Sequence, residues 1–320
     1  MPEAVYEKIV VVTRQTALEE LIVRFNTRDQ ARFYIEHMGA SFSEYQDAHD
    51  TYHKSLETLK TSLPRNVRSQ FIEREFLPNF TFGEKDLVVT LGPDGLVVNT
   101  AKYLSVQPLI AFNPDMTRIE GVLVPFPVAV ARPVLERAAL GRFALKKVSM
   151  AQAELNDGQT LLAVNDIFIG QRSHTSARYS LKLQSDFGVA EDQSSSGIIV
   201  STGAGSTGWL RSIIAGASGV MRAQTGHDLE ISPQDQARFD WEADHLVFSV
   251  REPFPSKVSS AQTVYGRIES GDALEIRSQM PQNGVIFSDG VEADYLEFNS
   301  GTIAHIGLSQ SKLHLVAQAT

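Results

Sequence analysis

The chain of 320 residues contains no cysteine. Disulfide bonds, thiol nucleophiles and cysteine-ligated zinc sites are therefore excluded. Long hydrophobic runs are also missing, because no uninterrupted apolar stretch reaches the roughly 18 residues that a membrane-spanning helix needs. The first residues lack the basic start and apolar stretch of a signal peptide. We therefore expect a cytoplasmic protein with no membrane partner.

An excess of positive charge is missing as well. Lysine and arginine number 29 against 38 aspartates and glutamates, a net charge of -9, so binding to nucleic acid through bulk charge is not expected. The hydrophobic share of 42% and the charged share of 21% are those of a folded soluble chain. A small-molecule enzyme or binding protein is the class that remains.

The N-terminal part alternates strand and helix patterns. Strongly apolar runs predict buried strands at 8–13, 86–91 and 107–112, and helical patterns lie at 17–25, 28–38 and 47–59. This alternation predicts an α/β domain with a parallel sheet over 1–125. In such sheets ligands bind beyond the carboxyl ends of the strands, where the GPDG segment at 92–95 lies.

The pattern changes after about Pro125. One helix is predicted at 133–140, and short strands follow at 143–150, 161–169, 177–183, 197–201, 245–250, 273–277, 285–287 and 295–298. A helical stretch interrupts them after Gly205. We expect a mainly β-sandwich domain over 126–320, with roughly the last 15 residues packing back on the first domain.

The first candidate site is Gly92-Pro93-Asp94-Gly95 at the end of a strand. Glycines let backbone N–H groups approach a phosphate, and an aspartate held there can take a proton from an attacking hydroxyl. Pro-Asp-Gly is also good turn chemistry, so a simple β-turn is the alternative interpretation.

The second candidate is the segment STGAGSTGW at 201–209, where a strand enters a loop of small and hydroxyl residues before a helix. Free amides before a helix suit an anion or a dinucleotide, and Trp209 offers an apolar wall for a base or a sugar. The alternative is a flexible loop with a core tryptophan.

The third candidate is Asn165-Asp166 in an apolar strand context. An amide can read an adenine edge and a carboxylate can accept ribose hydroxyls, whereas an Asx turn is the structural alternative. His49 and His53 have zinc-ligand spacing on a predicted helix, but the sequence indicates no third ligand, so we expect a solvated helix face and no metal site.

Four motifs in order make the chain similar to a known family. The chain resembles the NAD kinases in four motifs that follow one another in the same order. These are GPDG, FNPD at 112–115 with Glu120-Gly121, Asn165-Asp166, and STGAGSTGW. The resemblance extends from residue 8 to about residue 290, and several stretches look closer to the mitochondrial-type branch and its bacterial relatives.

The resemblance implies an α/β domain and a β-sandwich domain, with NAD between them and the γ-phosphoryl group of ATP moving to the 2′-hydroxyl of its adenosine ribose. It implies Asp94 as the catalytic residue and Mg²⁺ with ATP, because phosphoryl transfer needs neutralised charge. A homo-oligomer, as a homodimer, is also implied. The remaining implied contacts are phosphate or nucleotide binding by Gly92, Gly95, Asn113, Gly205 and Ser206, and dinucleotide binding by Asn165, Asp166, Thr207, Trp209 and Asp289.

Asp166, in place of a commoner glutamate, and Val291, in place of a frequent glutamine, depart from the family pattern, and three further departures keep alternatives open. Pro93 replaces a glycine and has no N–H, Leu96 replaces a threonine, and Ala204 replaces a serine or threonine. One alternative is a weak or inactive family member that binds a nucleotide as a sensor or scaffold. Another is a kinase of a different small hydroxyl compound.

Overall fold

The computed structural model describes all residues except 1–4, 186–189, 228–237 and 318–320. The chain forms two compact units, Met1–Lys146 with His314–Thr320, and Lys147–Leu313. The sequence-based boundary lay at 125, whereas the units divide at residue 146. The difference arises because the helix α5 (Ala131–Ala139) contributes Ala131, Leu135 and Ala138 to the core of unit 1.

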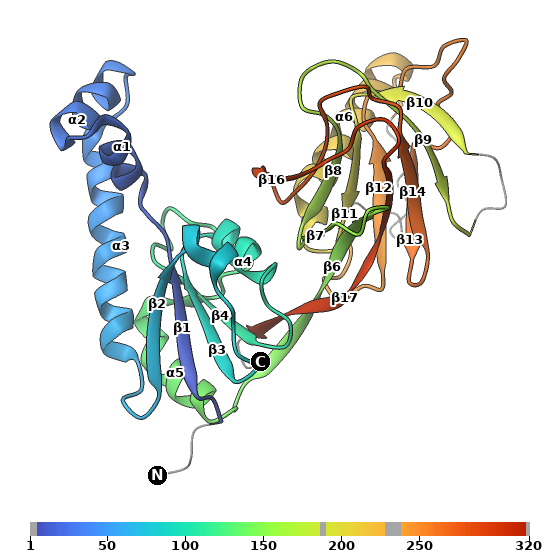
Figure 1. Cartoon of the computed structure of the whole chain (residues 1–320). Helices are drawn as coiled ribbons and strands as arrows, with labels where there is room; N and C mark the ends of the chain where they lie inside the picture. Colours follow the sequence, from blue (N-terminus) through green and yellow to red (C-terminus); the bar gives the residue numbers. More distant parts are fainter. Residues whose placement is uncertain (1–4, 186–189, 228–237, 318–320) are drawn as a thin grey trace. The chain divides into compact units, whose positions relative to one another are not determined.

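Unit 1 is built on a parallel sheet with strand order β2-β1-β3-β4-β17 (Figure 1). The strands are β1 (Lys8–Thr13), β2 (Arg68–Glu73), β3 (Asp86–Leu91), β4 (Pro108–Asn113), the short β5 (Phe126–Pro127) and the end of β17 (Ile303–Ala317). Every residue of β3 and β4 is buried, which agrees with their largely apolar sequences.

The described part of unit 1 has five helices. They are α1 (Ala17–Phe25), α2 (Arg28–His37), α3 (Phe42–Ser62), α4 (Asp94–Ala101) and α5, with 3-10 turns η1 (Arg74–Asn79) and η2 (Val128–Val130). Helices α1 and α2 pack on α3 rather than on the sheet. Thr16 starts the first helix with a capping box in which Thr16 and Glu19 satisfy each other's backbone N–H groups. The long helix α3 contributes Tyr52 and Leu59 to the core of unit 1.

Unit 2 is a β-sandwich, as the sequence predicts. One sheet holds β6 (Ala144–Leu155), β7 (Thr160–Ala163), β9 (Ala177–Leu183), β10 (Glu191–Ser195), β14 (Ala273–Ser278) and the first part of β17. The other has the order β13-β12-β11-β8-β15-β16, formed by Tyr265–Glu269, His245–Val250, Ile198–Ser201, Asp166–Gln171, Gly284–Ser288 and Val291–Glu297. One buried cluster draws side chains from both sheets.

A helix covers the outer face of the second sheet. The 3-10 turn η3 (Gly205–Thr207) leads into α6 (Trp209–Thr225), and Trp209 and Ile213 pack against Phe168, Ile199 and Val285. Among the described residues, no helix is both long enough and apolar enough to cross a membrane.

Two differences from the sequence pattern bear on function. The single strand expected at 161–169 is two strands, because the chain leaves the sheet of β7 at Ala163 and joins the other sheet at Asp166. Strands β2, β5, β10, β13 and β17 were not predicted. β10 has the sequence EDQSS and only one residue of β2 is buried, so neither shows apolar alternation.

Candidate functional site

A pocket of about 180 Å³ lies in unit 1 at the carboxyl ends of β1, β3 and β4. Arg14 follows β1, Gly92 and Pro93 follow β3, and Pro114 and Asp115 follow β4, and all five line this strand-edge pocket. The carboxyl ends of parallel strands meet at one edge, so these three loops converge as the topology requires. The pocket therefore joins the GPDG and FNPD segments that are far apart in sequence.

Asp94 is the first residue of α4, not the middle of a β-turn. Its two carboxylate oxygens accept the backbone N–H groups of Val122 and Leu123, each at 2.9 Å. Pro93 occupies the N-cap position, Gly95 is exposed, and Gly92 is buried against Leu96. Asp94 is thus held in place by the loop after β4, and each oxygen retains a lone pair for a further partner.

Asn113 is buried and organises that loop. Its side-chain amide donates to the carbonyl of Ile119 at 2.9 Å, and its oxygen accepts the N–H of Asp115. The hydrogen bond from the Thr117 hydroxyl, with the Arg118 guanidinium 2.8 Å away, outweighs burial and lowers the pKa of Asp115 to about 2. Asn113 therefore shapes the rim of the strand-edge pocket.

The second group of predicted residues lies where the chain changes sheets in unit 2. Backbone N–H groups at such a corner lose their partners in the strand ladder. Here one carboxylate replaces those partners: Asp289 accepts from the N–H groups of Val164, Asn165 and Asp166 at 3.2, 2.7 and 3.3 Å. We call residues 164–166 with Asp289 the sheet-switch corner. It brings Asn165, Asp166 and Asp289 together from positions more than a hundred residues apart.

The charged form of the Asp166 carboxyl group is unfavourable in this corner. Burial, followed by repulsion from the Asp289 carboxylate, raises the pKa of Asp166 to about 7, although a hydrogen bond from Ser201 acts in the opposite direction. Within the described part of the chain, its Oδ1 atom is buried without a hydrogen-bond partner. A buried oxygen without a hydrogen-bond partner makes the charged form of this carboxylate still less favourable.

This arrangement predicts a pH-dependent gain in stability for Asp166→Asn. Below about pH 4 the carboxyl group is protonated in both states; between about 4 and 7 the unfolded chain ionises while the folded chain keeps its proton. The free energy of unfolding of wild type therefore falls as the pH rises through this range. The asparagine variant has no carboxyl group at this position, so it does not lose this stability. We expect the melting temperature of the variant to exceed that of wild type by at least about 2 °C at pH 8. Melting curves at pH 4.5 and 8 check this, and an equal difference at both values contradicts it.

The small-residue loop packs tightly on the same corner. A Cβ atom on Gly205 would lie 2.3 Å from the carbonyl oxygen of Asn165, so only glycine fits. The Thr202 hydroxyl donates to the carbonyl of Val164, and its N–H donates to that of Asn165. Ser206 is buried and its hydroxyl donates to the Gly203 carbonyl at 2.7 Å, whereas Thr207 is partly exposed. Gly205 and Ser206 thus build the loop that lies beside Asn165 and Asp166.

Trp209 opens α6 and lies over the outer face of the second sheet. Its ring stacks on Phe168 with centroids 5.8 Å apart, and the Arg251 guanidinium lies 5.3 Å from it. These residues and Arg172 and Tyr295 line a pocket of about 220 Å³. Asp166 and Phe168 are alternate residues of β8, so their side chains share this sheet face. Two arginines beside aromatic rings suit a planar, phosphate-bearing ligand.

The sequence and the structure agree unevenly on these residues. Gly92, Asp94, Gly95 and Asn113 all lie at one sheet edge of unit 1, in the loop after β3, at the start of α4 and at the end of β4. The remaining predicted residues belong to unit 2. Arg172, Arg251 and Tyr295 beside Trp209 were missed. Nothing in the local sequence marks them, because they lie on separate loops and strands.

The chain was also compared with known proteins. No family model matches the chain. The rat protein "NAD kinase 2, mitochondrial" is 23% identical, covering 95% of this chain and 85% of its own length, and its human counterpart is also 23% identical, covering 95% and 82%. An NAD kinase of Heliobacterium modesticaldum is 29% identical over 46% of this chain and 52% of its own length.

Solved structures match the fold. A yeast NADH kinase complexed with NADH superposes with a TM-score of 0.57 at 16% identity, covering 98% of this chain and 84% of its own. An NAD kinase from Archaeoglobus fulgidus in complex with ATP has a TM-score of 0.56 at 14% identity, covering 97% and 93%. The two-unit architecture is therefore one that these kinases share.

Proposed function

We infer that this chain is a member of the NAD kinase family and transfers the γ-phosphoryl group of ATP to the 2′-hydroxyl of the adenosine ribose of NAD. The observation that carries this conclusion is the match of 95% of the chain to the mitochondrial NAD kinases, with the four motif segments placed at the strand-edge pocket and the sheet-switch corner. Asp94 orients or deprotonates the accepting hydroxyl in this proposal.

In unit 1, the proposal assigns the triphosphate to the strand-edge pocket. Arg14 supplies positive charge, Gly92 lines the pocket, and the exposed Gly95 leaves the backbone at the start of α4 accessible. Mg²⁺ binds mainly through phosphate oxygens and water in this scheme, since the carboxylates of Asp94 and Asp115 already accept backbone N–H groups. When bound, Mg²⁺ neutralises charge on the phosphates.

In unit 2, the proposal assigns the adenosine of NAD to the sheet-switch corner and the loop beside it. Asn165 bonds the adenine edge, and Asp166 accepts a hydrogen bond from a ribose hydroxyl. Thr207 and Trp209 line the pocket, Asp289 holds the corner, and Gly205 and Ser206 shape the loop.

A coupled assay for NADP formation tests this function. Purified chain with ATP and Mg²⁺ should convert NAD to NADP, and parallel reactions with NADH, polyphosphate and a panel of small alcohols define acceptor and donor. Calorimetry with NAD, NADP and ATP runs beside it. Binding without turnover would support a sensor or scaffold, and turnover of another alcohol but not of NAD would support a different kinase.

Trp209 gives a direct probe of the adenosine pocket. The chain has only two tryptophans, Trp209 and Trp241, so a change in emission can be assigned by substitution. We expect NAD to change the emission of wild type and Trp209→Phe to lose most of that change, because Trp209 lines the pocket beside Arg251. Survival of the change in Trp209→Phe with its loss in Trp241→Phe would show the assignment to be wrong.

Pro93→Gly is expected to strengthen phosphate binding. Position 93 lines the strand-edge pocket at the N-cap of α4, and glycine restores an N–H that proline lacks. A bond from this N–H to a phosphate contributes about 1.5–3 kcal/mol, which is roughly tenfold in affinity or more. Loss of the stiff proline lowers stability by about 0.4–1 kcal/mol. The Michaelis constant for ATP is measured in wild type and in the variant. If this constant is unchanged while the melting temperature falls, Pro93 is a turn residue only.

Two further properties belong to the same proposal. A homodimer is proposed from the family resemblance, and light scattering of the purified chain measures it. A cytoplasmic location is proposed because the chain has no cysteine, which fits a reducing compartment. Cell fractionation decides between this location and the mitochondrial one named for the rat and human relatives.

A further inference from the structure

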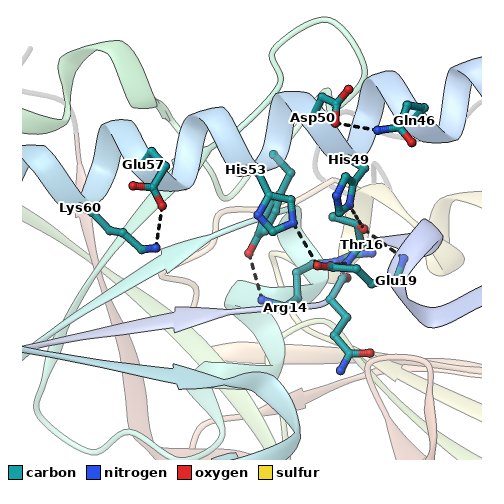
Figure 2. Close-up of polar contacts among 11 residues, drawn as sticks. Arg14, Thr16, Glu19, Gln46, His49, Asp50, His53, Glu57 and Lys60 are labelled. Carbon is teal, nitrogen blue, oxygen red and sulfur yellow. Dashed lines mark hydrogen bonds and ion pairs between the residues drawn. The ribbon is translucent and has the colours of Figure 1, made fainter. Parts of the chain in front are cut away.

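Three potential metal ligands, none of them a residue assigned above, meet in unit 1 beside the strand-edge pocket (Figure 2). His49 and His53 lie one turn apart on α3, and Glu19 comes from the first turn of α1. One ligand atom from each lies within 4.8 Å of the other two. Glu19 Oε1 is 3.0 Å from His53 Nε2, and the two imidazole rings have centroids 4.3 Å apart.

Bonds around the cluster fix the directions of the ligand atoms. Glu19 Oε2 accepts the backbone N–H of Thr16 at 2.7 Å, so Oε1 remains for a further partner. The Thr16 hydroxyl lies 2.9 Å from His49 Nδ1, which leaves Nε2 of that ring for a metal. Metal-binding histidines commonly use their second nitrogen in this way, because that bond sets the ring orientation. Figure 2 shows Thr16 between the two helices beside Glu19 and His49.

Solvent also reaches the cluster. The Glu19 and His53 side chains are 32% and 43% exposed, so an ion from solvent has access.

We propose that Glu19, His49 and His53 bind one divalent transition-metal ion of the zinc class. Two imidazole nitrogens and one carboxylate oxygen form a known three-ligand set for zinc, with a fourth position open to water. At metal–ligand distances of about 2.0–2.2 Å, tetrahedral ligand atoms lie roughly 3.4 Å apart, so the present spacing closes with small side-chain rotations. Mg²⁺ and Ca²⁺ prefer oxygen ligands and are weak occupants.

The bound ion joins α1 to α3. Thr16 connects the ion site to the strand-edge pocket. Thr16 contacts both Glu19 and His49 and also lines that pocket with Arg14. Because no residue of the proposed phosphate or adenosine contacts is a ligand, the ion is separate from the Mg²⁺ that accompanies ATP. Its first measurable effect is on the stability of unit 1.

The test uses the full chain without a histidine tag, freed of metal by chelation. We expect titration with Zn²⁺ to show one ion bound per chain at micromolar concentration or tighter, and a melting temperature that rises with Zn²⁺ but not with Mg²⁺. Co²⁺ provides a visible absorption spectrum as a second readout. His49→Gln and His53→Gln should each weaken Zn²⁺ binding by about 10²-fold, as a lost ligand does.

Two further variants separate ligand loss from misfolding. Glu19→Gln keeps a side chain that can serve the capping box but loses the charged ligand, so it should fold normally and bind Zn²⁺ more weakly. His174→Gln removes an exposed histidine of unit 2 and should bind as wild type does. Failure of wild type to bind Zn²⁺ below millimolar concentration overturns the proposal. So does equal Zn²⁺ affinity in wild type and in folded His49→Gln and His53→Gln.

Discussion

We expect Asp94→Asn to lower kcat for NADP formation by a factor of about 10² or more, the usual size of a lost acid–base contribution. The carboxylate is held by two backbone N–H groups from residues 122 and 123, so its position is set before substrate arrives. Asparagine keeps one oxygen acceptor for these groups and loses the ability to take a proton from the ribose hydroxyl. The chemical step, and not ground-state binding, therefore carries the loss.

The measurement separates these two effects. Steady-state kinetics give kcat, and calorimetry gives the dissociation constants of NAD and ATP for wild type and variant. We expect the two dissociation constants to change by less than about threefold, since a uniform loss of binding would raise KM without this change in kcat. Melting curves monitor the loop, because Val122 and Leu123 each depend on an Asp94 oxygen. Equal turnover in the two proteins would remove Asp94 from the mechanism.

The second large effect is expected from Asp289→Ala. This substitution leaves three backbone N–H groups of the sheet-switch corner without their acceptor. Because the corner is partly accessible to water and two of the three bonds are long, we expect a loss of about 2–4 kcal/mol, below the sum of three fully buried bonds. The melting temperature should fall by at least about 5 °C, and NAD affinity should fall with it as Asn165 and Asp166 lose their positions.

Two variants sharpen this test. Asp289→Asn retains an acceptor oxygen and removes the negative charge beside Asp166, so its stability should lie between those of wild type and Asp289→Ala, and most of its NAD affinity should remain. Asp157→Ala removes an aspartate that accepts a backbone N–H in an exposed turn of the same unit, and it should change the melting temperature by less than about 2 °C. Similar losses in Asp289→Ala and Asp157→Ala would mean that the corner has no special dependence on Asp289.

Local pattern was enough for much of the fold. The apolar runs at β1, β3 and β4, the helix after Thr16 and the change to short strands past residue 143 all carry their own periodicity, so the α/β unit and the sandwich follow from the sequence. The parallel topology then places the loops after β1, β3 and β4 at one edge. In this way the sequence alone located Asp94 and the FNPD segment near a common pocket.

Other features depend on partners distant in the chain, and local pattern carries no signal for them. β10 is a strand because it pairs with β9, although its own residues are polar. The sequence does not reveal the break between β7 and β8, because both strands are largely buried and their residues read as one apolar run. Only the structure shows that the two strands join different sheets. Asp289 acts on residues 164–166 from more than a hundred positions away, and Glu19 approaches His53 from another helix.

The sequence by itself therefore determined the two kinds of unit and the order of the motifs. Only the tertiary structure decided that Asp289 supports the corner, that burial and a second carboxylate raise the pKa of Asp166, and that Glu19 completes a three-ligand cluster. The physical reason is the range of each interaction. Periodicity and capping act between near neighbours in the chain, whereas burial, charge repulsion and ligand geometry depend on which segments the fold brings within a few ångströms.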